Sequence, residues 1–254
     1  SLELFDAWFA HPKPPALSGV TIQAVDLTER GAELASVPVV GTMFMGCRLT
    51  QASTASLRQR GALIFPVLPN IPFDPYRAAL YDAPALYEQL DQGYERTPDA
   101  KIYAWSRQNH ATSVASTLAM SLHDHAMTDA LDELPLASTP ERCIGIMGGH
   151  AAQRGSDSYR HAAHLAARLT TAEFTVMTGG GPGAMEAANL GAALADAGDE
   201  HLREVDAAVD LLAEVPSFRP IHQGGQGVTA WARQAFLVRE RYAPHGVSLG
   251  IPTW

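Results

Sequence analysis

The order of apolar and polar positions predicts two regions of different texture, which meet near residue 140. From Arg142 onward, "CIGIMGG" and "EFTVMTGG" are apolar runs typical of buried parallel strands, and each ends in glycines. The segments "SDSYRHAAHLAARLTT", "AMEAANLGAALADAG" and "VTAWARQAFLVRERY" carry apolar residues at helical spacing, and "GVSLGIP" predicts a third strand. This β-α-β-α-α-β order predicts a Rossmann-like parallel sheet with helices on both faces over residues 141–254.

The region before residue 140 has a less regular pattern. "GVTIQAVDLT" and "VPVVGTMFMGCRLT" predict strands, and "STASLRQRG" predicts a helix that ends near Gly61. Four prolines in "ALIFPVLPNIPFDPYRAALY" predict a stiff, ordered connection, and a helix is expected from Ala111 to Leu134. We therefore expect a smaller mixed α+β domain at residues 1–140, followed by the Rossmann-like domain at 141–254.

Composition excludes several classes of function. The 254 residues carry a formal net charge of −9 with no cluster of Lys and Arg, which argues against binding to a nucleic acid polymer. No stretch approaches the ~18 apolar residues of a membrane span, and the N-terminus lacks the pattern of a signal peptide. Two isolated cysteines, Cys47 and Cys143, favour free thiols in a reducing cytoplasm. The only lysines, Lys13 and Lys101, lie in polar segments, which argues against a Schiff-base enzyme. We expect no bound cofactor.

Two strands of the predicted sheet end in glycines, Gly148-Gly149 and Gly179-Gly180-Gly181. Ligands of open parallel sheets bind beyond the carboxyl ends of the strands, so both glycine groups fall where a ligand is expected. Glycine allows positive φ angles and lets a ligand approach the backbone closely. The alternative interpretation is a pair of tight strand-to-helix turns without a ligand.

The helix after the second glycine group is suited to phosphate. Pro182 sets the φ angle for a turn or for a first helical residue. Three N–H groups then point out of the first helical turn, where proteins commonly bind phosphate, and they belong to Gly183, Ala184 and Met185.

The glycine spacing also allows a dinucleotide, but less well. Gly179, Gly181 and Ala184 formally satisfy G-x-G-x-x-A, yet they follow the second strand of the unit, whereas that fingerprint belongs after the first. The lysine of a nucleoside-triphosphate phosphate loop is absent. A mononucleotide or sugar-phosphate site is therefore favoured, and an NAD(P)-dependent oxidoreductase is a weaker alternative.

The segment "TGGGPGAMEAANLGA" closely resembles the glycine-rich segment of the LOG (Lonely Guy) family. "CIGIMGGHAAQRGSDSY" looks like the first strand and loop of that family. "VSLGIPTW" and "GALIFPVLPNIPFDPYRAALY" are similar to parts of its longer bacterial members. The resemblance implies a Rossmann-like hydrolase that cleaves the N-glycosidic bond of a nucleoside 5′-monophosphate to free base and ribose 5-phosphate. It also implies a homodimer or a higher homo-oligomer.

The resemblance implies roles for individual residues. Gly148, Gly149 and His150 would lie near the nucleotide. The glycine loop and the start of the next helix would hold its phosphate through Gly179, Gly180, Gly181, Gly183, Ala184 and Met185. Glu186 is a candidate catalytic acid, with a simple helix-dipole role as the alternative. Asn189, one turn further, would contact a ribose hydroxyl or pack against the loop.

One departure from the family pattern weakens the expectation of catalysis. The second family signature, P-G-G-x-G-T-x-x-E, which supplies a catalytic glutamate, does not occur in this sequence, and neither does the R-K pair that precedes it. We expect the chain to be the front part of a longer protein, with a sheet that is incomplete at its C-terminal edge. The alternative is a non-catalytic module that binds a mononucleotide.

Histidine pairs do not predict a metal site. His123 and His125 flank Asp124 on a predicted helix, where nearby positions point in different directions, so an exposed helix face is the simpler interpretation. His161 and His164 could share a helix face, but no third ligand follows at a suitable spacing. We expect no metal.

Overall fold

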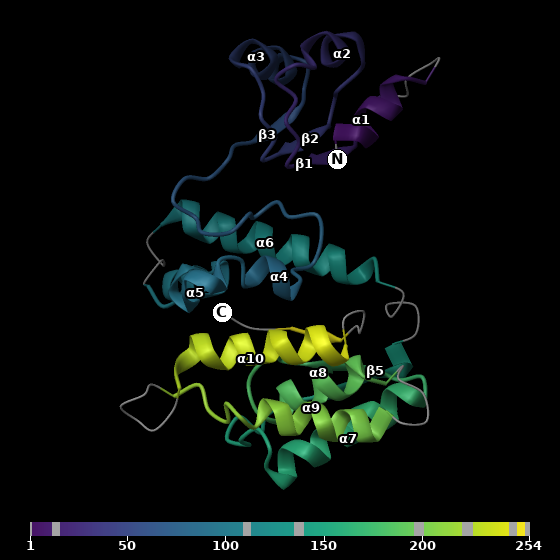
Figure 1. Ribbon diagram of the computed structural model, residues 1–254. Helices are drawn as coiled ribbons and strands as arrows, with labels where there is room; N and C mark the ends of the chain where they lie inside the picture. The colour runs from purple at the N-terminus through teal and green to yellow at the C-terminus, as the bar shows by residue number, and fades with distance from the viewer. Residues whose placement is uncertain are drawn as a thin grey trace. The chain divides into compact units, whose positions relative to one another are not determined.

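The computed structural model describes residues 2–11, 16–108, 113–134, 140–195, 201–219, 226–243 and 248–251. The chain divides into two compact units (Figure 1). The first unit comprises Ser1–Asp82 and Trp105–Glu133, and the second comprises Ala83–Ala104 and Leu134–Trp254. The segment 83–104, which the sequence pattern placed in the first domain, therefore packs with the second unit. The expected domain boundary near residue 140 stays a prediction.

The first unit is built on a parallel sheet whose strands are joined by helices. Its strand order is β1-β2-β3, and the register aligns Ile22, Phe44 and Ile64 across the sheet. The strands had been expected without a direction, and the short helical connections make them parallel. Apolar side chains of the strands and helices form one buried core around Phe44 and Leu34. The elements are α1 (Leu2–Phe9), β1 (Thr21–Gln23), α2 (Gly31–Ser36), β2 (Met43–Met45), α3 (Gln51–Gln59), β3 (Leu63–Phe65) and α6 (Val114–Asp132).

Helix α6 corrects one expectation about the histidines. His123 is buried, and its Nε2 lies 3.2 Å from the hydroxyl of Tyr81, while the ring of Phe73 packs edge-on against the imidazole. Burial lowers the pKa of His123. The expectation of an exposed helix face is therefore wrong for His123, because segment 73–81 covers it. Within the residues described, no helix combines the length and the apolar character needed to cross a membrane.

The second unit contains the Rossmann-like sheet, which confirms the mixed α/β fold class. Its strands are parallel in the order β4-β5-β6, with Ile144 opposite Val176 and Met177 opposite Leu249. Three short 3₁₀ helices are labelled η. The elements are α4 (Ala83–Leu86), η1 (Leu90–Gln92), η2 (Tyr94–Arg96), η4 (Pro140–Arg142), β4 (Cys143–Ile146), α7 (Asp157–Thr171), β5 (Thr175–Thr178), α8 (Ala184–Ala193), α9 (His201–Leu212), α10 (Gly227–Tyr242) and β6 (Leu249–Gly250), and α5 (Pro98–Ser106) runs across the boundary between the units.

Small side chains let α7 and α8 pack closely against β5 and against each other (Figure 1). Helix α7 begins as the sequence predicts, because the Ser156 hydroxyl accepts a hydrogen bond from the N–H of Tyr159 at 3.3 Å. Alanines then fill the contact between the two helices. The buried alanines of this contact and of the adjoining core are Ala163, Ala166, Ala167, Ala187, Ala188 and Ala192.

Helix α9 contacts α7 through ion pairs and hydrogen bonds as well as through its apolar face. Arg160 donates to Asp206 at 2.8 Å and to Asp210 at 2.7 Å, and the Nε2 of His164 lies 2.9 Å from Asp206. On the other side of the same helix, Val205 and Val209 are fully buried. Helix α9 is therefore amphipathic, and its acidic face is partly used in contacts with α7.

The segment 83–104 reaches the second unit through α10. The N–H of Tyr94 donates to the hydroxyl of Thr229 at 2.9 Å, and Arg233 donates to the carbonyl of Asp91 at 2.6 Å. The ring of Tyr87 packs edge-on against that of Phe236, with 5.5 Å between the ring centroids. These contacts hold α10 in place, and α10 contributes one wall of the candidate site.

Candidate functional site

The two glycine groups meet at the carboxyl edge of the β4-β5-β6 sheet. Gly149 and Gly183 have φ angles of +68° and +77°. A Cβ on Gly183 would come closer than 3.0 Å to the carbonyl oxygen of Gly149, and a Cβ on Gly149 would stand 2.5 Å from that of Ala184. Neither position admits a side chain, so the backbone of the first glycine turn lies directly on the start of α8.

The start of α8 leaves backbone donors available. Gly183 is the N-cap and offers no side chain, while the N–H of Ala184 donates to the carbonyl of Gly149 at 3.2 Å. Across the described ranges, no backbone acceptor faces the N–H groups of Met185 and Glu186. Of the three N–H groups expected to hold a phosphate, that of Ala184 is therefore already used within the protein. The available N–H groups are those of Met185 and Glu186, one and two residues further along the helix.

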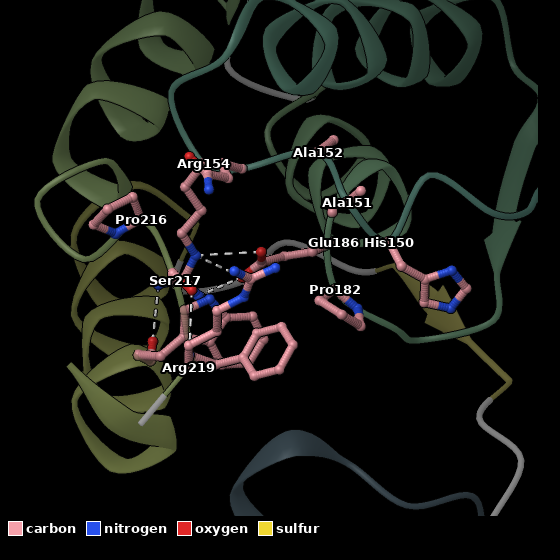
Figure 2. A pocket seen from close by; sticks show the side chains of 13 residues that line it. His150, Ala151, Ala152, Arg154, Pro182, Glu186, Pro216, Ser217 and Arg219 are labelled. Carbon is pink, nitrogen blue, oxygen red and sulfur yellow. Dashed lines mark hydrogen bonds and ion pairs between the residues drawn. The ribbon is translucent and has the colours of Figure 1, made fainter. Parts of the chain in front are cut away.

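A hollow of about 100 Å³ opens beside this helix start. Its walls come from the loop after β4, the start of α8, the turn after α9 and the first turns of α10 (Figure 2). It is smaller than the roughly 150 Å³ of a protein cavity that takes benzene, so it encloses a phosphate or part of a sugar rather than a whole nucleotide. The lining residues are His150, Ala151, Ala152, Gln153, Arg154, Pro182, Gly183, Glu186, Pro216, Ser217, Phe218, Arg219 and Trp231.

A buried ion pair between Arg154 and Glu186 forms the centre of the hollow (Figure 2). The Nε of Arg154 donates to the Glu186 carboxylate oxygens at 3.1 Å and 3.2 Å, and its Nη2 donates to Oε1. The Arg154 side chain is 1% exposed and that of Glu186 is 16% exposed. Both residues line the hollow, and Glu186 is the more exposed of the two.

The remaining donors of Arg154 hold the walls together. Its Nη1 donates to the carbonyls of Val215 at 3.3 Å and Trp231 at 2.9 Å, and its guanidinium carbon lies 4.2 Å from the centre of the Trp231 ring. Arg154 thus joins the loop after β4 to α8, to the turn after α9 and to α10. It is a structural clamp, because nearly all its N–H groups are already used.

The charges of the ion pair influence the pKa values of two nearby tyrosines, Tyr159 and Tyr87. Burial, with a further contribution from Glu186, raises the pKa of Tyr159 well above its usual value. Its hydroxyl is buried and makes no hydrogen bond of ordinary geometry among the described residues, although Glu186 and Arg154 lie close enough to act on it. Burial also raises the pKa of Tyr87, with Asp99 and Glu186 adding to the effect. Both phenols remain protonated at neutral pH.

The other predicted site residues fall into two groups. His150 lines the hollow, but its ring points away from the ion pair and lies beyond Pro182 (Figure 2). Gly179 and Gly181 make room for the buried Met185 side chain, whose sulfur and methyl carbon would stand 3.1 Å and 2.7 Å from a Cβ there. The lining of the hollow includes His150, Gly183 and Glu186 but not Gly148, Gly149, Gly179, Gly180, Gly181, Ala184, Met185 or Asn189.

Asn189 lies at the sheet edge, one turn below Met185. Its amide nitrogen would stand 3.5 Å from a Cβ on Gly250, whose backbone also approaches Gly180. The side-chain oxygen Oδ1 of Asn189 is buried and has no hydrogen-bond partner within the described ranges. Packing against the glycine loop is therefore observed, and contact with a ribose stays a prediction.

Sequence reasoning missed the residues that form most of the hollow, namely Arg154, Ser217, Phe218, Arg219 and Trp231. Arg154 lies five residues after Gly149 in the loop that follows β4, and an arginine in a loop at a strand end was the available signal. Arg160 of α7 does not line the hollow and pairs with Asp206 and Asp210 of α9. Among the described residues, His, Cys, Asp and Glu side chains do not gather in groups of three that could hold a metal ion.

Comparison with known proteins supports a nucleotide-related role at a coarse level. Residues 141–198 match the model of the SLOG cluster4 family, and this range contains both glycine groups, Arg154 and Glu186. The match is consistent with a LOG-like domain and does not single out the LOG family. No curated protein and no solved structure matches the chain.

Proposed function

We propose that the second unit binds a nucleoside 5′-monophosphate, with the phosphate at the start of α8. The observation that carries this proposal is the contact of Gly183 with Gly149, which brings two glycine strand ends to one point beside unpaired N–H groups. Such N–H groups and the dipole of the helix favour an anion. The match of residues 141–198 to the SLOG cluster4 family supports the same class of ligand.

Arg219 would supply positive charge to the phosphate. Its side chain is exposed, lines the hollow, and has no hydrogen-bond or ion-pair partner in the described part of the chain. This contrasts with Arg154, whose guanidinium is already used by the protein. A guanidinium that is free at an anion site matches phosphate geometry and is not neutralised beforehand.

Calorimetry with a set of related ligands tests the proposal. AMP should bind at least about ten-fold more tightly than adenosine, because the phosphate makes charge-assisted hydrogen bonds that the nucleoside lacks. Arg219→Ala should weaken AMP binding by about three- to ten-fold. Arg168→Ala, which removes an exposed arginine of α7 outside the hollow, is the matched control and should bind AMP normally. Equal affinity for AMP and adenosine would refute the phosphate site.

Cleavage of the N-glycosidic bond is the second candidate function, and the position of Glu186 favours it. Such cleavage develops positive charge on the ribosyl ring, which a nearby carboxylate stabilises. Glu186 presents a carboxylate to the hollow beside the proposed phosphate site. Its ion pair with Arg154 reduces the negative charge available, which favours binding without cleavage.

Release of free base distinguishes the two functions. The chain is incubated with AMP, CMP or GMP, and the products are separated by chromatography. Base release that Glu186→Gln abolishes even at saturating AMP identifies a hydrolase with Glu186 in a catalytic role. Binding without release identifies a nucleotide-binding module.

A further inference from the structure

The Glu186 carboxylate is held in one orientation and retains unused acceptor capacity. Arg154 occupies both oxygens from one side, through Nε and Nη2. A carboxylate offers about four lone-pair positions, so acceptor positions remain on the side that faces the hollow. The 16% of the Glu186 side chain that is exposed opens there, whereas Arg154 is almost fully enclosed.

The ion pair selects the kind of donor that the carboxylate can accept. Arg154 and Glu186 together carry no net charge, so an ammonium group gains little by approaching the pair, and a phosphate would meet carboxylate oxygens. A neutral O–H or N–H donor is the group that suits these remaining lone pairs. A hydrogen bond from a neutral donor to an ionised acceptor is also stronger than one between two neutral groups.

The position of Glu186 in the helix indicates which part of a nucleotide supplies that donor. Glu186 is the third residue of α8, in the same turn as the unpaired N–H groups proposed to hold the phosphate. In a nucleoside 5′-monophosphate the sugar is bonded directly to the phosphate, and the base lies further away. The hollow of about 100 Å³ has room for part of a sugar but not for a base as well, and Trp231 and Phe218 give it an apolar wall.

We propose that Glu186, oriented by Arg154, accepts hydrogen bonds from the ribose 2′- and 3′-hydroxyls and so makes the site specific for ribonucleotides over deoxyribonucleotides. This inference rests on the proposed function, because it needs the phosphate at the start of α8. Glu186 contacts the ligand, and Arg154 is a positioning residue that holds the carboxylate in one orientation. Tight selection follows because a site built to hydrogen-bond a hydroxyl leaves a buried acceptor unpaired when that hydroxyl is missing.

Ligand analogues test the inference on the unmodified protein. Calorimetry compares AMP, 2′-deoxy-AMP and 3′-deoxy-AMP under the same conditions. Loss of a hydrogen bond to a charged acceptor should weaken binding by about ten-fold or more for at least one deoxy analogue. If AMP and both analogues bind equally, the ribose inference is overturned and the proposed function stands. If none of the three binds, the proposed function itself fails.

A variant assigns the selectivity to Glu186. Glu186→Gln keeps the shape of the side chain and loses the charge, so the ratio of AMP to deoxy-AMP affinity should fall from about ten-fold to less than about three-fold. Affinity for inorganic phosphate should be retained, which shows that the glycine loop is still formed. Glu214→Gln, in an exposed acid on the turn after α9, is the matched control and should keep the ratio. An unchanged ratio in Glu186→Gln removes Glu186 from the sugar site, and the analogue comparison remains decisive if this variant does not fold.

Discussion

Gly191 of α8 lies directly on the backbone of Ala163 in α7, so that a Cβ on Gly191 would come closer than 3.0 Å to the Ala163 carbonyl oxygen. Glycine in a helix interior normally costs about 1 kcal/mol relative to alanine. Here the missing side chain allows α7 and α8 to approach, and it thereby fixes α8 and its N-terminal turn against the sheet. The glycine is a packing requirement rather than a weakness of the helix.

Gly191→Ala should therefore destabilise the protein despite the higher helix propensity of alanine. The overpacked contact should cost about 1–3 kcal/mol in the free energy of unfolding, measured by urea denaturation. Gly145→Ala is the control, since no atom of the described residues lies within 4 Å of a Cβ at that position and its φ angle is negative. It should change stability by less than about 0.5 kcal/mol. A Gly191→Ala variant as stable as the wild type would mean that the two helices are not packed this closely.

Arg154→Met should be strongly destabilising because it leaves Glu186 without its partner. Breaking one side of a buried ion pair typically costs about 3–5 kcal/mol, and the contacts to Val215 and Trp231 are lost as well. Arg142→Met is the matched control, since Arg142 pairs with Glu173 at 3.2 Å where the side chains are 50% and 83% exposed. Exposed pairs contribute about 0–1 kcal/mol, so this variant should unfold at nearly the wild-type urea concentration. Similar losses for both variants would contradict the clamp.

The clusters between α7 and α9 predict a loss of stability in acid. Burial raises the pKa of Asp206, but hydrogen bonds from Arg160 and His164 outweigh it, and the pKa lies below its usual value of 3.8. A carboxyl group whose pKa is lowered by folding stabilises the protein above its unfolded pKa, and this contribution disappears as the pH falls through the folded pKa. The melting temperature should therefore drop between about pH 4 and pH 2, and Asp206→Asn should show less of this drop.

Glu240→Gln is the control for the acid series, since it removes an exposed carboxylate of α10. Its melting temperature should follow the wild-type curve at every pH. If Asp206→Asn follows that curve too, the α7–α9 cluster does not contribute to the acid dependence.

Helices and strands that are determined by residues close together in the sequence could be predicted. The candidate site could be predicted only in part, because it also depends on residues far apart in the sequence. The helix that follows Ser156 and the glycine ends of β4 and β5 are local features, and the sequence pattern located them correctly. The Arg154 clamp could not be predicted in this way, because its partners lie 32, 61 and 77 residues further along the chain. The packing of 83–104 against α10 depends on contacts of still longer range, such as that between Tyr94 and Thr229.

His123 shows the same limit for a single residue. On its own helix it looked exposed, and its burial comes from Phe73 and Tyr81, which lie on a proline-stiffened connection about forty residues earlier. The spacing of apolar residues along one helix predicts which face of that helix is buried, but it does not show which other segments pack against the remaining faces. Oligomeric state, cytoplasmic location and the individual phosphate contacts stay predictions. They depend on a second copy of the chain, on the cellular compartment and on a ligand, which the local sequence pattern does not describe.

Two glycines near the site separate backbone strain from steric contact. Gly148 and Gly183 both have positive φ angles, +88° and +77°. In the part of the chain that the structure describes, nothing lies within 4 Å of a Cβ on Gly148, whereas a Cβ on Gly183 would meet the carbonyl of Gly149. Gly148→Ala should therefore cost about 1–2 kcal/mol from its φ angle alone. Gly183→Ala should cost about 1–3 kcal/mol more, because the loop after β4 must move away from α8.

Urea denaturation combined with AMP calorimetry checks this pair of glycine variants. Gly148→Ala should still bind AMP, since the start of α8 is undisturbed, and Gly183→Ala should lose binding even at temperatures where it remains folded. If Gly183→Ala were no less stable than Gly148→Ala, the loop after β4 would not be seated on the helix start. The unpaired N–H groups would then lack the fixed position that the phosphate site requires.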